Sequence, residues 1–228
     1  MVSATFLVVG AFLLSATGDC GAPVCESVAG ADLLSASGVP TVSSEKEVLS
    51  SLLRDAESRT RARIPPTSPL WEDYRQAKRD LRNKDVEAAK EALGGVIASA
   101  TEFAPAYYYL GLMAAGGRRF EEAENYYKTA LGVDPGFTLV RANLGNLYYR
   151  RCRFPEAAVE YERVLKAVPD FAEVHRRLAE AYSEDRSRFG DAARHFRRYL
   201  ELVKEPIDRT AVEKRVIELE VSGMRNAQ

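Results

Sequence analysis

From residue 70 onward, apolar residues recur every three or four positions, and short stretches rich in proline, glycine or charged residues separate the apolar runs. This spacing places the apolar side chains on one face of a helix. Prolines and glycines are typical of helix ends. The pattern therefore predicts an all-α fold built from consecutive helices.

The helical pattern repeats at a fixed interval. Residues 104–137 form the clearest copy, and residues 138–171 match it position by position. Residues 70–103 are a degenerate copy in phase with them, and residues 172–206 are a good fourth copy. A longer turn, residues 183–189, shifts the fourth copy by one residue. The recurring positions of the two clear copies are Gly111, Ala123, Tyr127 and Pro135, and then Gly145, Ala157, Tyr161 and Pro169.

Each recurring residue type has a role in helix packing. The glycines and alanines leave room for two helices to approach each other closely. The tyrosines follow the alanines by four residues, so they share a helical face with them and fill the space between helix pairs. The prolines end the second helix of each pair. A single pair cannot bury its own apolar face, so the copies are expected to stack.

This 34-residue pattern resembles the tetratricopeptide repeat family over four units, residues 70–103, 104–137, 138–171 and 172–206. The resemblance implies a right-handed α-solenoid of helix-turn-helix repeats, in which the first helix of each repeat lines a concave groove. Residues 207–228 are predicted to form a capping helix and tail that cover the last apolar face and solvate the end of the solenoid.

The N-terminal segment, residues 1–18, contains no charged side chain, and residues 2–16 form an apolar run of the length typical of a secretory signal. We predict a signal peptide over residues 1–18 and an exported protein, periplasmic or secreted. The run is short for a membrane span. An anchor in the inner membrane, formed by uncleaved residues 2–18, is the alternative.

Between this segment and the repeats, the low charge and small side chains of residues 19–43 predict a flexible tether. A short amphipathic helix is predicted over residues 44–63, because Ser44 and Glu47 have the spacing of a capping box and apolar residues follow on one face. The proline-rich residues 64–69 predict a spacer. We expect the helix to pack against the first repeat.

The three cysteines leave the redox chemistry open. In an oxidising compartment, Cys20 and Cys25 could close a small disulfide loop, whereas Cys152 has no obvious partner in the sequence and is predicted to be a free, partly buried thiol. The spacing of the cysteines and of the two histidines does not suit a metal site. His175 is predicted to pack within its helix and His195 to lie at the surface.

Composition and motif content count against several classes of protein function. The net charge of -1 provides no global field for nucleic acid. The sequence contains no phosphate-binding glycine loop, nucleophile elbow or paired-histidine metal motif. We therefore predict a protein that is not an enzyme, has no cofactor and does not bind nucleic acid.

In the tetratricopeptide family, ligands are held in the concave groove by residues at set positions of the first helices. Carried over to this sequence, the resemblance implies a partner-binding groove formed by Tyr74, Lys78, Tyr108, Tyr109, Asn143, Asn146, Tyr149, Arg150, Arg176 and Arg177. Amide side chains can bond a peptide backbone, and arginines can bind a carboxylate with two parallel hydrogen bonds. The family's chaperone-tail clamp is matched at Asn143 and Arg177 but has Glu173 in place of a lysine, which disfavours an acidic C-terminus as ligand.

These features predict a protein-protein interaction scaffold or assembly factor that binds a peptide or helix of a partner protein, in a bacterial cell envelope. The alternative is a structural spacer that is anchored in the membrane and self-associates. In that case the only membrane contact is through the N-terminal segment. The pattern specifies neither the partner nor the oligomeric state.

Overall fold

The structure is a computed structural model that describes residues 41–203, 206 and 208–226. The predicted signal segment and residues 19–40 of the predicted tether lie outside these residues. Every regular element in the described part of the chain is a helix. These residues form two compact units, unit 1 over residues 46–143 and unit 2 over residues 144–226, with residues 41–45 assigned to unit 2.

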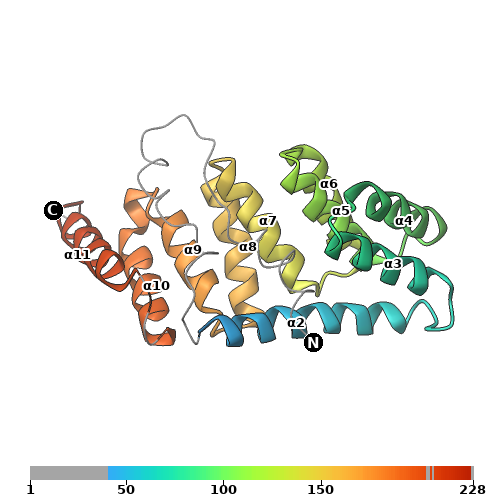
Figure 1. Cartoon of the computed structure of the whole chain (residues 1–228). Helices are drawn as coiled ribbons and strands as arrows, with labels where there is room; N and C mark the ends of the chain where they lie inside the picture. Colours follow the sequence, from blue (N-terminus) through green and yellow to red (C-terminus); the bar gives the residue numbers. More distant parts are fainter. Residues whose placement is uncertain (1–40, 204–205, 207, 227–228) are drawn as a thin grey trace. The chain divides into compact units, whose positions relative to one another are not determined.

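Unit 1 consists of most of α2 and the first two repeats (Figure 1). Its helices are α2 (Thr41–Arg61), α3 (Leu70–Arg82), α4 (Val86–Ser99), α5 (Ala104–Gly116), α6 (Phe120–Val133) and the first part of α7 (Thr138–Arg150). Unit 2 contains the rest of α7, α8 (Phe154–Ala167), α9 (Ala172–Tyr182), the short 3-10 helix η1 (Arg186–Arg188), α10 (Phe189–Leu202) and α11 (Arg209–Asn226).

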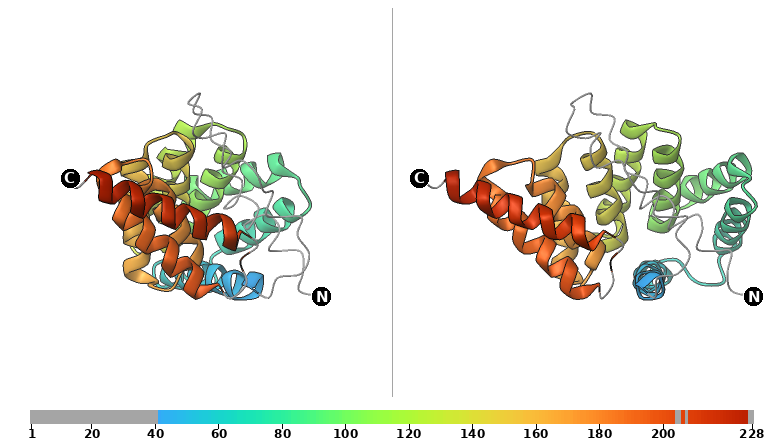
Figure 2. Two further views of the ribbon diagram at one scale, coloured as in Figure 1. Left: turned by 90° about the vertical axis from the view of Figure 1, so that its left-hand side faces the viewer. Right: turned by 60° about the vertical axis from the view of Figure 1, so that its left-hand side comes forward.

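Helices that are adjacent in the sequence pack on each other within each unit. In unit 1, α4 lies between α3 and α5, and α5 also packs on α6; in unit 2, α9 lies between α8 and α10, and α10 also packs on α11. The two further views of Figure 2 show the same succession of helix pairs. This arrangement confirms the predicted all-α array of helix-turn-helix repeats.

The recurring glycines and tyrosines touch as the repeat spacing predicts. A Cβ atom added to Gly145 would lie 2.7 Å from the Cε1 atom of Tyr161, and one added to Gly111 would collide with the ring of Tyr127. Both tyrosines are 1% exposed. Nothing larger than a hydrogen atom fits at either glycine. At these two positions the first helix of the repeat can therefore approach the second closely.

The turn inside each of the first three repeats has the same geometry. Lys84, Arg118 and Cys152, which occupy equivalent positions of their repeats, all have a left-handed backbone, with φ between 57° and 64°. The amide of the next residue bonds the carbonyl five positions back in each case, as in the bond from Asp85 to Asp80 at 2.9 Å. This is the Schellman motif, in which the left-handed position is usually glycine.

Replacing Lys84 by glycine should therefore stabilise the protein. The left-handed region costs a non-glycine residue about 1 kcal/mol, and Lys84 is exposed, so Lys84→Gly should raise the free energy of unfolding by about 0.5–1 kcal/mol. Denaturant unfolding measures the change. Lys84→Ala keeps the Cβ atom and serves as the control; an equal gain in both variants would contradict the backbone explanation.

The fourth repeat has a different connection. Ser183 to Arg188 link α9 to α10 and include η1, whereas three residues suffice in the earlier repeats, as in Gly117–Arg119. The carboxylate of Asp185 accepts bonds from the amide and hydroxyl of Ser187, at 2.9 and 2.7 Å, and so orders this longer turn. The predicted longer turn is thus present.

The helix before the repeats begins earlier than predicted. It starts at Thr41, so Ser44 lies inside the helix rather than at its N-cap. In unit 1, α2 runs crosswise to α5 and α6 (Figures 1 and 2). Its second half packs closely, with Ala56, Glu57 and Thr60 buried.

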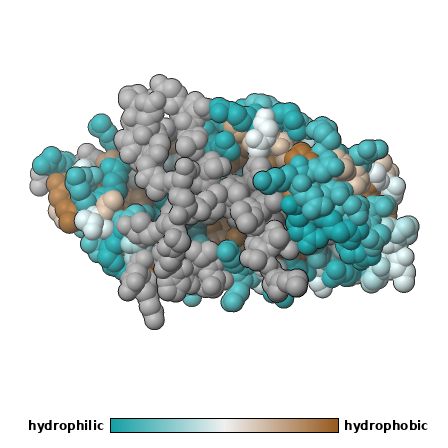
Figure 3. Space-filling view, in the orientation of Figure 1, coloured by the Kyte–Doolittle hydropathy of each residue, from teal (hydrophilic) through white to brown (hydrophobic). Residues whose placement is uncertain are grey.

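The capping helix α11 is apolar on two faces. Its inner face is buried against unit 2 through Val212, Val216 and Leu219. On the outside, Ile217, Val221 and Met224 are 62%, 44% and 69% exposed and follow one another at spacings of four and three residues. Figure 3 shows apolar surface near the C-terminal end of this helix. The outer face of α11, predicted to solvate the end of the solenoid, thus carries an apolar stripe beside its charged residues.

Candidate partner-binding site

In unit 1, the first predicted ligand-binding side chains contact α2. The hydroxyl of Tyr74 and the ammonium group of Lys78 both donate to the same carboxylate oxygen of Glu57, each at 2.8 Å. The ring of Tyr109 lies 5.8 Å from that of Tyr74. Glu57 is only 8% exposed, so its charge is neutralised by Lys78 in a largely dry environment.

A second contact joins α2 to the turn between α6 and α7. The Arg59 guanidinium donates to both carboxylate oxygens of Asp134, at 3.0 and 2.9 Å, and to the carbonyl of Gly136 at 3.1 Å. Arg63 donates to the carbonyl of Val133 at 2.7 Å. The Asp134 carboxylate is held in place by the amide of Gly136, at 3.1 Å. Two anchors of opposite charge therefore fix α2 to the repeats.

The turn after α2 is held by Trp71. Its indole NH donates to the carbonyl of Ile64 at 3.2 Å, and the Arg61 guanidinium lies 4.8 Å from the centre of its ring system. Trp71 is 1% exposed and packs against Phe103, with ring centroids 4.7 Å apart. The expectation that the helix packs against the first repeat is confirmed.

Two other predicted groove residues of unit 1 are buried in its core. Tyr108 is fully buried and packs on Phe137, with ring centroids 5.3 Å apart. Asn143 is 4% exposed, and its amide donates to the carbonyl of Leu139 in its own helix, at 2.8 Å. Burial raises the pKa of Tyr108 well above its usual value, with Tyr109 as the next cause. These two residues support the repeat from within.

In unit 2, three predicted residues lie on one face of α7. Asn146, Tyr149 and Arg150 are spaced by three and four positions, and all three are half-buried. The carbonyl oxygen of Asn146 accepts the hydroxyl of Tyr161 at 2.7 Å. The ring of Tyr149 packs edgewise on Phe154, with centroids 5.3 Å apart. This hydrogen bond and this ring contact fix the orientation of Asn146 and Tyr149.

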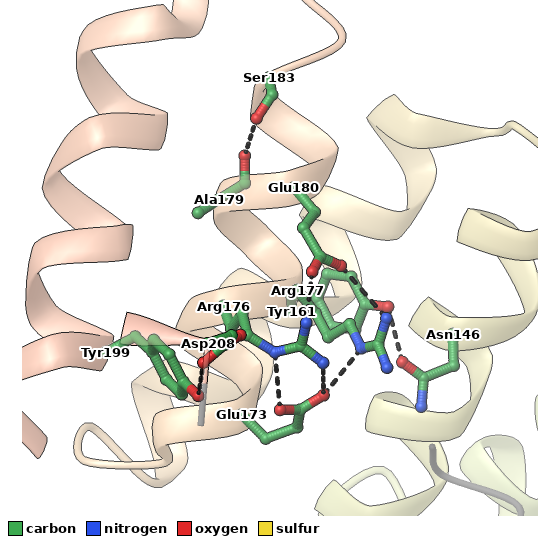
Figure 4. A network of polar contacts seen from close by, with 10 residues as sticks. All are labelled: Asn146, Tyr161, Glu173, Arg176, Arg177, Ala179, Glu180, Ser183, Tyr199 and Asp208. Carbon is green, nitrogen blue, oxygen red and sulfur yellow. Dashed lines mark hydrogen bonds and ion pairs between the residues drawn. The ribbon is translucent and has the colours of Figure 1, made fainter. Parts of the chain in front are cut away.

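The last two predicted groove residues, Arg176 and Arg177, form an ion-pair network within α9 (Figure 4). Arg176 donates to both oxygens of Glu173, at 3.1 and 3.0 Å, and to Glu180 at 2.7 Å. Arg177 donates to the same two glutamates, at 2.8 and 3.2 Å. Both arginines are buried, with 9% and 7% of their surface exposed. Their guanidinium groups already bind carboxylates of their own helix, and the four charges cancel.

The network shifts the pKa values of its members. Burial alone would raise the pKa of Glu173, but the charges of Arg176 and Arg177 and their hydrogen bonds outweigh it and hold that pKa below 4.5. Glu45, near the start of α2 and grouped with unit 2, has its pKa raised to about 7 by burial and then by Glu173, while Arg176 opposes the rise. Sequence reasoning treated Glu173 only as a mismatch to a clamp. Its spacing of three and four residues from the arginines is the signal that could have revealed the network.

The two histidines form a pair. The Nδ1 atoms of His175 and His195 are 2.9 Å apart, and His175 Nε2 donates to the carbonyl of Pro169 at 2.8 Å, so His195 supplies the proton between the rings. Burial and then the neighbouring His175 lower the pKa of His195 to about 4. His195, on α10, is half-buried where its ring meets His175 of α9, so the prediction that it lies at the surface holds only in part. His175 packs as predicted.

Cys152 is disulfide-bonded, so the prediction of a free thiol is wrong. Its partner lies outside the described residues, and the predicted pairing of Cys20 with Cys25 also falls there. Within residues 41–203, 206 and 208–226, no group of three His, Cys, Asp or Glu side chains is placed to bind a metal ion. No helix in the same ranges has both the length and the apolarity of a membrane span.

Comparison with known proteins supports the assignment of the repeats. Two family models, both described as tetratricopeptide repeat, match residues 74–136 and 112–181. No curated protein sequence matches the chain.

Several solved structures share the fold. "MamA 41-end from Desulfovibrio magneticus RS-1" aligns over 69% of this chain and 94% of its own, with a TM-score of 0.59 and 18% identity. Pseudomonas aeruginosa pilF aligns over 80% of this chain and 90% of its own, with a TM-score of 0.58 and 15% identity. Identities this low show a shared fold only. Together with the glycine-tyrosine contacts and turns that recur from one repeat to the next, the two family models show that residues 74–181 are tetratricopeptide repeats.

Proposed function

We propose that this protein is a non-enzymatic scaffold or assembly factor that binds a peptide or helix of a partner protein through the first helices of its repeats. One observation carries the proposal. The repeats of unit 1 already hold a helix, α2, through Tyr74 and Lys78, two of the side chains expected to bind a ligand. A face that binds one charged amphipathic helix has the chemistry to bind another.

The face of α7 in unit 2, formed by Asn146, Tyr149 and Arg150, suits the same role. An amide can bond a peptide backbone, a tyrosine ring supplies rigid contact area, and a guanidinium can bind a carboxylate with two hydrogen bonds. All three are partly exposed on one side of one helix. We therefore place the partner's contacts in unit 2 on this face.

We further propose that the protein works in a bacterial cell envelope after export. The apolar, uncharged residues 2–16 support export, since they have the pattern of a secretory signal. The disulfide at Cys152 supports it as well, because disulfides persist in oxidising compartments and are rare in the cytosol.

Site-specific photo-crosslinking in the native host tests the binding face. A benzoylphenylalanine in place of Tyr149 should crosslink to a partner protein, because this position lies on the proposed face. The same residue in place of Tyr126, a half-buried tyrosine on the second helix of its repeat, is the matched control and should not. The crosslink at position 149 should weaken at least tenfold when Asn146→Ala and Arg150→Ala are added. Equal crosslinking at both positions, or none at position 149, would refute the proposed face.

A further inference from the structure

Polar contacts of Glu57 and Arg59, near the C-terminal end of α2, attach this helix to unit 1. Its apolar residues Val48, Leu49, Leu52 and Leu53 are only half-buried. Among residues 45–64, close burial is confined to Ala56, Glu57 and Thr60, together with Ile64 after the helix. A helix that is part of a core buries its leucines fully. The way α2 is held resembles a bound ligand more than a core element.

The groups that hold α2 belong to the repeats. Tyr74 and Lys78 project from α3, and Asp134 is fixed in the α6–α7 turn by the amide of Gly136. The side chain of Asp134 is 4% exposed, so its charge needs a cationic partner. These three residues form what we call the α2-binding face. It presents one cationic anchor, Lys78, and one anionic anchor, Asp134.

The anchors impose a charge pattern on whatever binds there. Lys78 and Tyr74 require a carboxylate, which Glu57 supplies, and Asp134 requires a guanidinium, which Arg59 supplies. We propose that α2 is a displaceable internal ligand and that the α2-binding face, once released, binds a partner helix that carries a glutamate followed two residues later by an arginine. The inference rests on the proposed scaffold function only in assuming that a partner helix exists.

The connection between α2 and α3 makes α2 a strong competitor. It comprises residues 62–69, which include three prolines and keep α2 close to its binding face. A tether this short gives an effective concentration of ~1 mM. If the helix alone binds with a Kd of ~10 µM, α2 occupies the face about 99% of the time and weakens the apparent affinity of a competing helix ~100-fold.

A peptide of residues 46–64, fluorescently labelled, tests the proposal by anisotropy against the full-length chain. The peptide should bind wild-type protein weakly, because α2 blocks the face. It should bind a full-length Glu57→Gln/Arg59→Gln variant at least tenfold more tightly, because these substitutions loosen α2 and leave the repeats unchanged. Equal affinity for the two proteins would overturn the proposal.

Two controls separate recognition from general loosening. Full-length Glu47→Gln, at an exposed glutamate of α2, should bind the peptide like wild type. A peptide carrying Glu57→Gln and Arg59→Gln should lose at least tenfold in affinity for the variant protein, and retained affinity would overturn the proposed charge pattern. Dimers of the wild-type chain, detected by light scattering, would overturn the partner helix as the occupant, because they would assign the face to α2 of a second copy.

Hydrogen exchange on the wild-type chain gives a test that needs no variant. If α2 is displaceable, amides in residues 46–61 should exchange through a local opening at least tenfold faster than those of α3 and α5. Exchange of all three helices at one common rate would show that α2 is part of the core. A negative result in the peptide-binding test or in the hydrogen-exchange test would leave crosslinking at Tyr149 unaffected. Failure of this inference can therefore be distinguished from failure of the proposed scaffold function.

Discussion

Gly145→Ala should destabilise the protein by about 2 kcal/mol, although alanine is normally the better residue within a helix. The added Cβ atom would lie 2.7 Å from the ring of Tyr161, closer than carbon atoms approach in folded proteins. Tyr161 cannot easily yield, because it is 1% exposed and its hydroxyl donates to Asn146 at 2.7 Å. The first helix would have to shift away from the second. Urea unfolding monitored by circular dichroism measures the loss.

Gly95→Ala is the matched control for this prediction. Gly95 also lies inside a helix, α4, but apart from its chain neighbours and the nearby backbone of its own helix, no atom comes within 4 Å of the position of an added Cβ. Alanine should therefore raise the free energy of unfolding by about 0.5–1 kcal/mol through its helix propensity alone. The decisive result is that the two substitutions change the free energy of unfolding in opposite directions. A gain at both positions would contradict the role of Gly145 in spacing the helices.

The helix pairs could be predicted from the sequence because the contacts that define them are local and repeated. Gly145 and Tyr161 are 16 positions apart, and the same pair of residue types recurs at Gly111 and Tyr127. A pattern that occurs twice in register constrains the packing of both copies. The left-handed turns also recur once in each of the first three repeats, yet they were missed, because Lys84, Arg118 and Cys152 are not residues that usually mark this conformation.

The position of α2 over the side chains of unit 1 could not be predicted in this way. The bond from Arg59 to Asp134 joins residues 75 positions apart, and nothing in either local sequence indicates the other. One hint was present. Glu57 follows Ala56 on the packed side of the helix, where a charged residue needs a partner of opposite charge. That partner, Lys78, was itself a predicted groove residue.

The predicted groove residues illustrate a second limit. Family positions indicate which helix carries a residue, but the neighbouring side chains determine whether it reaches the surface. Asn143 is buried and bonds its own helix, while Lys78 remains partly exposed, with 24% of its side chain accessible. Burial of this kind depends on three-dimensional neighbours, so the sequence indicated a set of candidates rather than a site.

The network on α9 should be the most sensitive polar cluster in unit 2. Glu173→Gln preserves the shape of the side chain but removes one of two negative charges that balance Arg176 and Arg177. A buried guanidinium left without its carboxylate is costly, and removal of one member of a buried ion pair typically destabilises a protein by about 3–5 kcal/mol. We expect about 3 kcal/mol here, because the side chain of Glu173 is 17% exposed and Glu180 remains. Denaturant unfolding measures the loss.

The exposed pair between Arg198 and Glu201 in α10 provides the comparison for this network. Its members have side chains that are 42% and 62% exposed, and exposed ion pairs contribute little to stability. Glu201→Gln should therefore leave the unfolding curve unchanged.

The stabilising effect of Glu173 should depend on pH. The pKa of Glu173 is lowered in the folded state, so the contribution of this residue to stability is present above pH 4.5 and is lost as the pH falls through its pKa in the folded protein. The difference in stability between wild type and Glu173→Gln should accordingly shrink in acid. A difference that stays constant from pH 7 to pH 3 would mean that lost packing, rather than lost charge, explains the effect.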